Sequence, residues 1–141
     1  MRFETLAVHA GAKADVETGA IASPLHLTTT FKHGPAGERV AGYEYQRESN
    51  PTQDRLEECL AALEGGEAAL AYASGMASMT GLLESLPKGS HVLIPADCYT
   101  GLRFLGCEFL NSCGIETQHV NMARLDEARA ALRRNTRLIW A

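Results

Sequence analysis

Beyond residue 66 the sequence alternates short apolar runs with stretches of helical periodicity, and this alternation restricts the fold class more than any other feature. The apolar runs expected to form strands are 68–72, 91–94, 115–120 and 137–141. Helical patterns lie between them at 76–86, 99–111 and 123–133. Strands that alternate with helices form parallel sheets through right-handed crossovers. The sequence therefore predicts an α/β fold, part of a mainly parallel sheet with helices on both faces.

Before the first of these runs, a well-marked helix is predicted to begin at Pro51. Asn50 can serve as its N-cap, proline is favoured at the first helical position, and Gln53 is spaced as a capping-box partner. Gly65 and Gly66 would end the helix. The apolar residues of the segment share one helical face: Leu56, Cys59, Leu60 and Leu63.

Residues 1–50 differ from the rest, because glycine and proline interrupt them and no helical period is expected to last more than a turn. Such a long irregular segment indicates function, or packing against another molecule. We therefore divide the chain into an N-terminal arm, 1–50, and the first part of an α/β domain, 51–141. Because the run 137–141 ends with no helix to cover it, we expect this domain to be truncated and the chain to be the N-terminal part of a longer protein.

Composition excludes several classes of function. The chain has 141 residues, 45% of them hydrophobic and 21% charged, as in ordinary globular proteins. A net charge of −4 argues against nucleic acid as a partner. No apolar run approaches the roughly 20 residues of a membrane span, and the N-terminus does not look like a signal peptide, so we expect a cytoplasmic protein. The 4 cysteines and 5 histidines have no zinc-ligand spacing, which argues against a metal site.

The segment 71–76 is the first candidate site. It joins a predicted strand to a predicted helix through Ser74 and Gly75, where free backbone N–H groups and the helix dipole favour an anion such as phosphate. It matches neither GxGxxG nor GxxxxGK[ST], which disfavours a nucleotide-binding loop. Taken alone, Ser74 is better explained as an N-cap and Gly75 as a packing glycine.

Two further positions can bind a ligand. Arg47 has a planar donor fork suited to phosphate and lies near Tyr45, although a surface ion pair with Glu44 or Glu48 explains Arg47 better when it is taken alone. Tyr99 follows the run 91–94, which places it at the carboxyl edge of a parallel sheet, where such folds bind ligands. Its ring can stack on a flat ligand or be half-buried at a helix start.

Together these segments resemble the Cys/Met-metabolism enzymes that depend on pyridoxal phosphate, which include cystathionine synthases and lyases, methionine γ-lyase and O-acetylhomoserine sulfhydrylase. The resemblance covers nearly the whole chain and is strongest at Tyr45-x-Arg47-x-x-Asn50-Pro51-Thr52. Other matching segments are 4–11, 18–20, 28–31, 56–57, 63–66 and 74–78. It implies the fold-type I architecture of this family, the cofactor pyridoxal 5'-phosphate, and a homo-oligomer, typically a dimer of dimers.

The resemblance also implies a role for each matching residue. The amides of Gly75 and Met76 would bind the cofactor phosphate, and Tyr45 and Arg47 would reach the phosphate in the neighbouring subunit, on which the arm packs. Tyr99 would stack on the pyridine ring close to the reacting substrate, as the catalytic residue of this chain. Where the family has Gly-Gly-Thr after this tyrosine, the chain has Thr100-Gly101-Leu102, and Arg103 comes one position early.

The family's Schiff-base lysine, and the aspartate that pairs with the pyridine nitrogen, lie beyond Ala141. Lys88 follows the predicted helix 76–86 and is expected about 18 Å from the phosphate-binding end of that helix, too far to replace that lysine. Lys13 and Lys32 lie in the arm. The function expected is elimination or replacement of the trans-sulfuration type on sulfur-containing or homoserine-derived amino acids. The alternative is a non-catalytic remnant or assembly module without that lysine.

Overall fold

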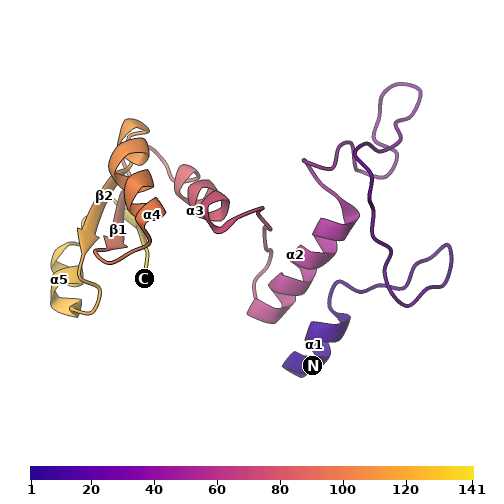
Figure 1. Cartoon of the computed structure of the whole chain (residues 1–141), viewed down its shortest axis with the longest axis horizontal. Helices are drawn as coiled ribbons and strands as arrows, with labels where there is room; N and C mark the ends of the chain where they lie inside the picture. The colour runs from indigo at the N-terminus through magenta and orange to yellow at the C-terminus, as the bar shows by residue number, and fades with distance from the viewer. The chain divides into compact units, whose positions relative to one another are not determined.

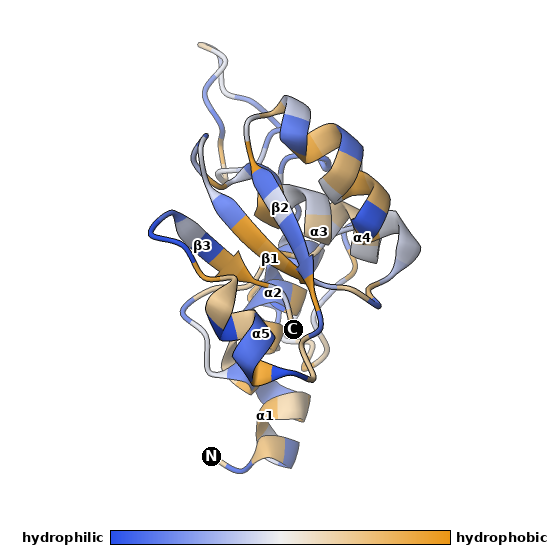
Figure 2. Ribbon diagram, turned by 90° about the vertical axis from the view of Figure 1, so that its left-hand side faces the viewer, coloured by the Kyte–Doolittle hydropathy of each residue, from blue (hydrophilic) through white to orange (hydrophobic).

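A parallel sheet lies at the centre of the C-terminal half of the chain (Figures 1 and 2). The computed structural model describes residues 1–141. The strands are β1 (His91–Pro95), β2 (Glu116–Val120) and β3 (Thr136–Ile139), in the order β2-β1-β3. Both neighbours pair with β1 in parallel. Three of the four predicted strands are thus confirmed, together with the parallel connection between them.

Helices cover both faces of this sheet (Figure 2). On one face, α3 (Gly75–Glu84) and α4 (Thr100–Phe104), which continues as the π-helix η1 (Leu105–Leu110), pack over Val92 and Ile94. On the other face, Leu93 packs with Val120 and with Ala131, which follows α5 (Leu125–Ala130). The predicted α/β architecture is confirmed as an incomplete α/β domain.

The predicted strand 68–72 is wrong. These residues form no ladder with any of the three strands, which pair only among themselves. The backbone N–H and C=O groups of a strand need hydrogen-bond partners in a neighbouring strand. Here the N–H of Ala71 donates instead to a side chain, to Oε1 of Glu57 at 2.7 Å. The chain divides into two units at this segment, Met1–Ala71 and Tyr72–Ala141, so the helix α2 (Pro51–Glu64) groups with the arm.

The arm begins with a helix that was not expected, α1 (Phe3–His9), which packs against α2. The statement that no helical period lasts more than a turn in residues 1–50 is therefore wrong. Phe3, Leu6, Ala7 and Ala10 have the spacing of one helical face and carried the missed signal. After α1 the chain passes so close to α2 that a Cβ on Gly11 would lie 2.2 Å from the carbonyl oxygen of Arg55. Only glycine fits there, with φ of +70°.

The start of α2 follows the sequence closely except in one detail. The side chain of Asn50 accepts from the N–H of Thr52 at 2.8 Å, Pro51 takes the first position, and Gly65 ends the helix at φ 68°. The predicted capping box is wrong, because Gln53 donates to Glu57 within the helix. No residue of α2 is buried, and its apolar stripe stays largely uncovered, with Leu56 52% exposed.

Candidate functional site

Tyr99 stands where the chain leaves the carboxyl end of β1 and enters α4. Its side chain is 64% exposed, and its carbonyl accepts from the N–H of Leu102 at 3.0 Å. The guanidinium of Arg103 donates to the carbonyl of Ala96, at the start of the loop that leads to Tyr99. The shifted Arg103 therefore fastens the loop that presents Tyr99 at the predicted edge of the sheet.

Gly101 brings Tyr99 and Met76 together. A Cβ at Gly101 would lie 2.6 Å from Cε1 of Tyr99 and 2.7 Å from Sδ of Met76, so both side chains lie over this glycine. The ring of Tyr99 is thereby placed beside the first turn of α3, the turn predicted to bind phosphate. In the sequence, Gly101 differs from the family pattern only as one residue of Thr100-Gly101-Leu102, and nothing in its spacing indicates that it makes room for Tyr99 and Met76.

The first turn of α3 has free hydrogen-bond donors. Ser74 is its N-cap, since Oγ accepts from the N–H of Ala77 at 3.1 Å. The N–H groups of Gly75 and Met76 donate to no group of the chain. A Cβ at Gly75 would meet nothing within 4 Å, so the space over this turn is open. The capping role proposed for Ser74 is confirmed, and it leaves two adjacent amides available to an anion.

Tyr45 and Arg47 lie at the end of a hairpin-like fold of the arm. Isolated antiparallel bridges join Thr30 to Tyr45 and His33 to Arg39. The guanidinium carbon of Arg47 lies 4.6 Å from the centre of the Tyr45 ring, within cation–π range. Both residues line an open hollow with Thr30, His33, Glu44 and Glu48. The structure thus brings Tyr45 and Arg47 together within the first unit.

The surface ion pair considered for Arg47 does not form. Glu44 and Glu48 both pair with Arg39 instead, at 2.6 Å and 2.8 Å from Nη2. The hydrogen bond that Arg39 donates to Glu44 is the largest cause of a raised pKa of Arg39, and the charges of Glu44 and Glu48 raise it further. Arg47 forms no salt bridge and no hydrogen bond through its side chain. Sequence spacing cannot reveal this choice, because Arg39 comes within reach only through the reversal of the chain between residues 33 and 39.

Asn50 and Thr52, which belong to the strongest matching motif, connect the start of α2 to the arm through hydrogen bonds to the backbone of His26. Besides capping α2, Asn50 donates from Nδ2 to the carbonyl of His26 at 3.2 Å, and the hydroxyl of Thr52 accepts from the N–H of His26 at 3.0 Å. Nearby, the hydroxyl of Tyr43 donates to Oδ2 of Asp54 at 2.5 Å. That bond, together with burial, raises the pKa of Tyr43. These contacts hold the arm against the start of α2.

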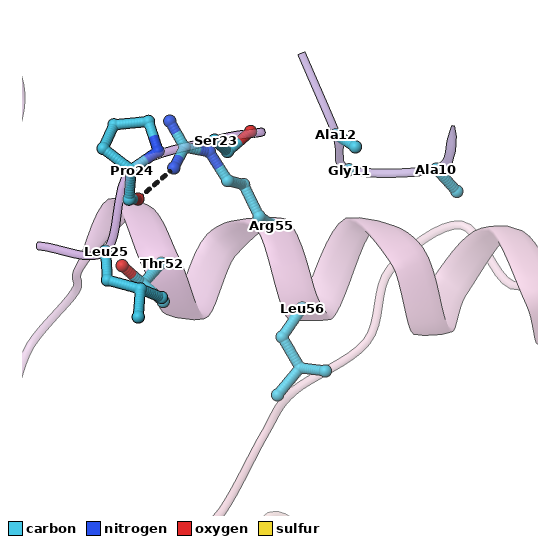
Figure 3. A pocket seen from close by; sticks show the side chains of 9 residues that line it. All are labelled: Ala10, Gly11, Ala12, Ser23, Pro24, Leu25, Thr52, Arg55 and Leu56. Carbon is cyan, nitrogen blue, oxygen red and sulfur yellow. Dashed lines mark hydrogen bonds between the residues drawn. The ribbon is translucent and has the colours of Figure 1, made fainter. Parts of the chain in front are cut away.

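A second hollow lies between α2 and the arm, and Figure 3 shows its lining. Its walls are mostly small or apolar residues, including Ala10, Gly11 and Leu56. Its one charged side chain, Arg55, donates to the carbonyl of Pro24 at 2.7 Å, drawn as the dashed line. This hydrogen bond gives Arg55 a structural role, because it connects α2 to the arm.

Lys88 lies at the opposite end of the sheet from Tyr99. It precedes the amino end of β1, and its side chain lies beside Gly114, with Cγ 3.8 Å from where a Cβ would stand. Tyr99 follows the carboxyl end of the same strand. The sequence argument that Lys88 cannot serve the site within its own subunit agrees with this placement.

No helix of the chain is both long and apolar enough to cross a membrane.

The C-terminal unit is an incomplete parallel α/β domain, with two free amides at the start of α3 and the exposed ring of Tyr99 near them. The comparisons with known proteins identify the family. The model of the Cys/Met metabolism PLP-dependent enzymes matches residues 4–141, so the chain belongs to this family, whose cofactor is pyridoxal 5'-phosphate.

Relatives in sequence and in structure agree. Cystathionine gamma-lyase of Bacillus subtilis is 38% identical over 140 residues, which is 99% of this chain and 37% of that protein. A probable cystathionine gamma-synthase of Herpetosiphon aurantiacus is 40% identical over 138 residues, 98% of this chain and 43% of the relative. The crystal structure of metB from Corynebacterium glutamicum superposes with a TM-score of 0.90 at 37% identity, covering 100% of this chain and 37% of that one. The chain therefore spans well under half the length of these relatives.

Proposed function

We propose that this chain supplies the phosphate-binding and ring-stacking residues of a pyridoxal-phosphate enzyme of the trans-sulfuration type. The observation that carries the proposal is the grouping of Tyr99, Met76 and Gly101 at the carboxyl edge of the sheet, beside two unused amides. An open site, free N–H donors and an exposed flat ring fit a flat cofactor that bears a phosphate. Names of relatives, cystathionine lyases and synthases, support the class of substrate.

Each residue has a separate task in this proposal. The amides of Gly75 and Met76 bind phosphate oxygens, and the helix dipole of α3 adds to the attraction. The ring of Tyr99 stacks on the pyridine ring and orients the amino group of the substrate. Tyr45 and Arg47 add phosphate contacts in a second copy of the chain. The arm's exposed apolar side chains, such as Leu27 at 95%, support the proposal that residues 1–50 pack on that neighbouring subunit.

The substrate class is a small amino acid that contains sulfur or derives from homoserine. When bound, pyridoxal phosphate acts as an electron sink that stabilises a carbanion on such a substrate, which permits elimination or replacement at its side chain. The residues of this chain bind and orient, while proton transfer requires a lysine that this chain does not place near Tyr99. We propose a homo-oligomer, a dimer of dimers in the full-length enzyme, in the cytoplasm.

The placement of Lys88 favours a second candidate, a non-catalytic remnant or assembly module. Under this alternative the chain keeps the phosphate site but forms no covalent link to the cofactor. Pyridoxal phosphate should bind to the purified chain in both cases, and neither case predicts a covalent link there. A visible absorption band that disappears on reduction with borohydride would exclude the non-catalytic alternative, and it would also contradict the placement of the lysines in the 141-residue chain.

A titration with pyridoxal phosphate tests the site itself. Replacement of Gly101 by alanine should push the Tyr99 ring and Met76 aside and weaken binding by about tenfold, because lost stacking is worth on the order of 1 kcal/mol. Fold stability should change little, since alanine favours the helix by up to about 1 kcal/mol. Thr100→Ala is the matched control on the adjacent, exposed position. Equal affinity of G101A and the wild-type chain would remove the support for a site at Tyr99.

A further inference from the structure

We infer that Arg39 is a positioning residue that keeps Arg47 free to bind phosphate, by holding the carboxylates of Glu44 and Glu48. The inference rests on the proposed function and assigns a role to a residue outside the matching motif. The two arginines of this part of the arm differ in their ion pairs. Arg47 is flanked by glutamates in sequence yet forms no ion pair, whereas Arg39 forms two.

The backbone of the arm produces this arrangement. The chain reverses over residues 34–37, where the N–H of Gly34 donates to the carbonyl of Glu38 at 2.9 Å and that of Gly37 to Gly34 at 3.0 Å. The N–H of Phe31 then donates to the carbonyl of Glu44 at 3.0 Å, which aligns the two sides of the hairpin. As a result, the guanidinium of Arg39 reaches Glu44 through Nε at 2.9 Å and through Nη2 at 2.6 Å.

The same nitrogen, Nη2, also donates to Glu48 at 2.8 Å. One arginine therefore occupies both carboxylates that flank Arg47. Each of these ion pairs is exposed, with side-chain exposure between 44% and 54%, so neither contributes much to stability. Their effect is instead on the neighbouring cation, because Glu44, Glu48 and Arg47 line one open hollow.

Charge explains why this matters for an anion. With Arg39 present, the charges of Glu44 and Glu48 are balanced by Arg47, which lines the hollow with them, and by Arg39, which pairs with both. Without it, two unpaired carboxylates would compete for the donors of Arg47 and would repel a phosphate dianion. Arginine binds phosphate through a planar pair of donors, and a carboxylate occupies that same pair. The stacking of Arg47 on Tyr45 then leaves its guanidinium held but unpaired, ready for a phosphate.

The test measures binding of pyridoxal 5'-phosphate and of pyridoxal, which lacks the phosphate, to the full chain by fluorescence titration. Arg39→Ala should weaken binding of the phosphorylated compound by about fivefold, since each exposed charge competition is worth under about 1 kcal/mol. Binding of pyridoxal should not change. In the variant R39A/E44Q/E48Q the competing carboxylates are gone, and affinity should return to that of the wild type. Arg124→Ala is the matched control, because Arg124 also pairs with two exposed carboxylates, Asp126 and Glu127.

A second readout does not need the cofactor. In a nitrogen-15-labelled chain, the Nε–Hε resonance of Arg47 should shift in R39A, as the guanidinium pairs with the freed glutamates, and return in the triple variant. An unchanged resonance, or R39A binding like the wild type, would overturn the inference. Loss of binding that the triple variant does not restore would also overturn it, because Arg39 would then act by holding the hairpin. If the wild-type chain binds both compounds equally, the proposed function itself fails.

Discussion

The two units of the chain are similar in length but differ in what holds them together. Every buried hydrophobic side chain lies in Tyr72–Ala141, where Leu83, Leu93 and Ile94 are completely inaccessible. In Met1–Ala71 the one buried residue is Asn50, and large apolar side chains such as Leu25 are 73% exposed. The second unit therefore rests on apolar burial, and the first on hydrogen bonds between the arm and α2.

The largest effect is expected in the second unit. Leu93→Ala should destabilise it by about 2 to 5 kcal/mol, because truncation of a fully buried leucine removes apolar contacts and leaves a cavity. Denaturant titration followed by fluorescence of the single tryptophan, Trp140, which packs against this unit's core, measures the loss. Leu56→Ala on the exposed face of α2 should cost less than about 1 kcal/mol. Similar costs for the two variants would break the contrast between the units.

A smaller effect is expected when Asn50, the polar centre of the first unit, is changed. Asn50→Ala should cost about 1 to 2 kcal/mol, because it removes the N-cap of α2 and leaves the carbonyl of His26 without its donor. Hydrogen exchange of the amides of Thr52 and its neighbours should rise. Asn50→Asp keeps the cap acceptor and loses the donor, so it should fall between. If exchange in α2 is unchanged in N50A, hydrogen bonds do not hold this unit.

The hydroxyl of Tyr43 offers a test by pH. Because the contact with Asp54 raises the pKa of Tyr43, the neutral phenol is favoured in the folded chain. Its stabilisation, about 1 kcal/mol, is fully present below the usual tyrosine pKa of about 10 and disappears as pH rises through the folded value. Tyr43→Phe should therefore weaken the first unit at neutral pH and match the wild type at strongly alkaline pH. Phenolate absorbance against pH measures the shift directly, and a normal titration of Tyr43 would contradict it.

The smallest effect belongs to Glu116 in the second unit and has the opposite sign with pH. Arg133, 2.6 Å away, lowers the pKa of Glu116, so this contribution is present above the usual glutamate value and is lost as pH falls through the folded value. Both side chains are exposed, and salt should screen the effect. Glu116→Gln should remove a small acid-side dependence of stability without changing the alkaline side. An unaltered acid profile would show that the pair contributes nothing measurable.

The parts of the fold that the sequence predicted are those set by neighbours along the chain. The cap at Asn50, the glycine stop at Gly65 and the three strands follow from short-range patterns, and all were recovered. The strand prediction for residues 68–72 was wrong because a strand also requires a partner strand, which its own residues cannot supply. Helix α1 was not predicted for another reason. Its apolar spacing is present in the sequence, but the glycines that follow indicated an irregular segment.

The candidate site divides in the same way. Sequence and resemblance named Tyr45, Arg47, Gly75, Met76 and Tyr99, and the assignment of these residues to the cofactor stays a prediction. Only the tertiary structure decided that Gly101 leaves room for Tyr99 and Met76, and that Arg39 takes the glutamates beside Arg47. Residue type and spacing determine which groups can donate or stack, because those properties are local. Which donor meets which acceptor depends on where the backbone turns, and that is a property of the folded chain alone.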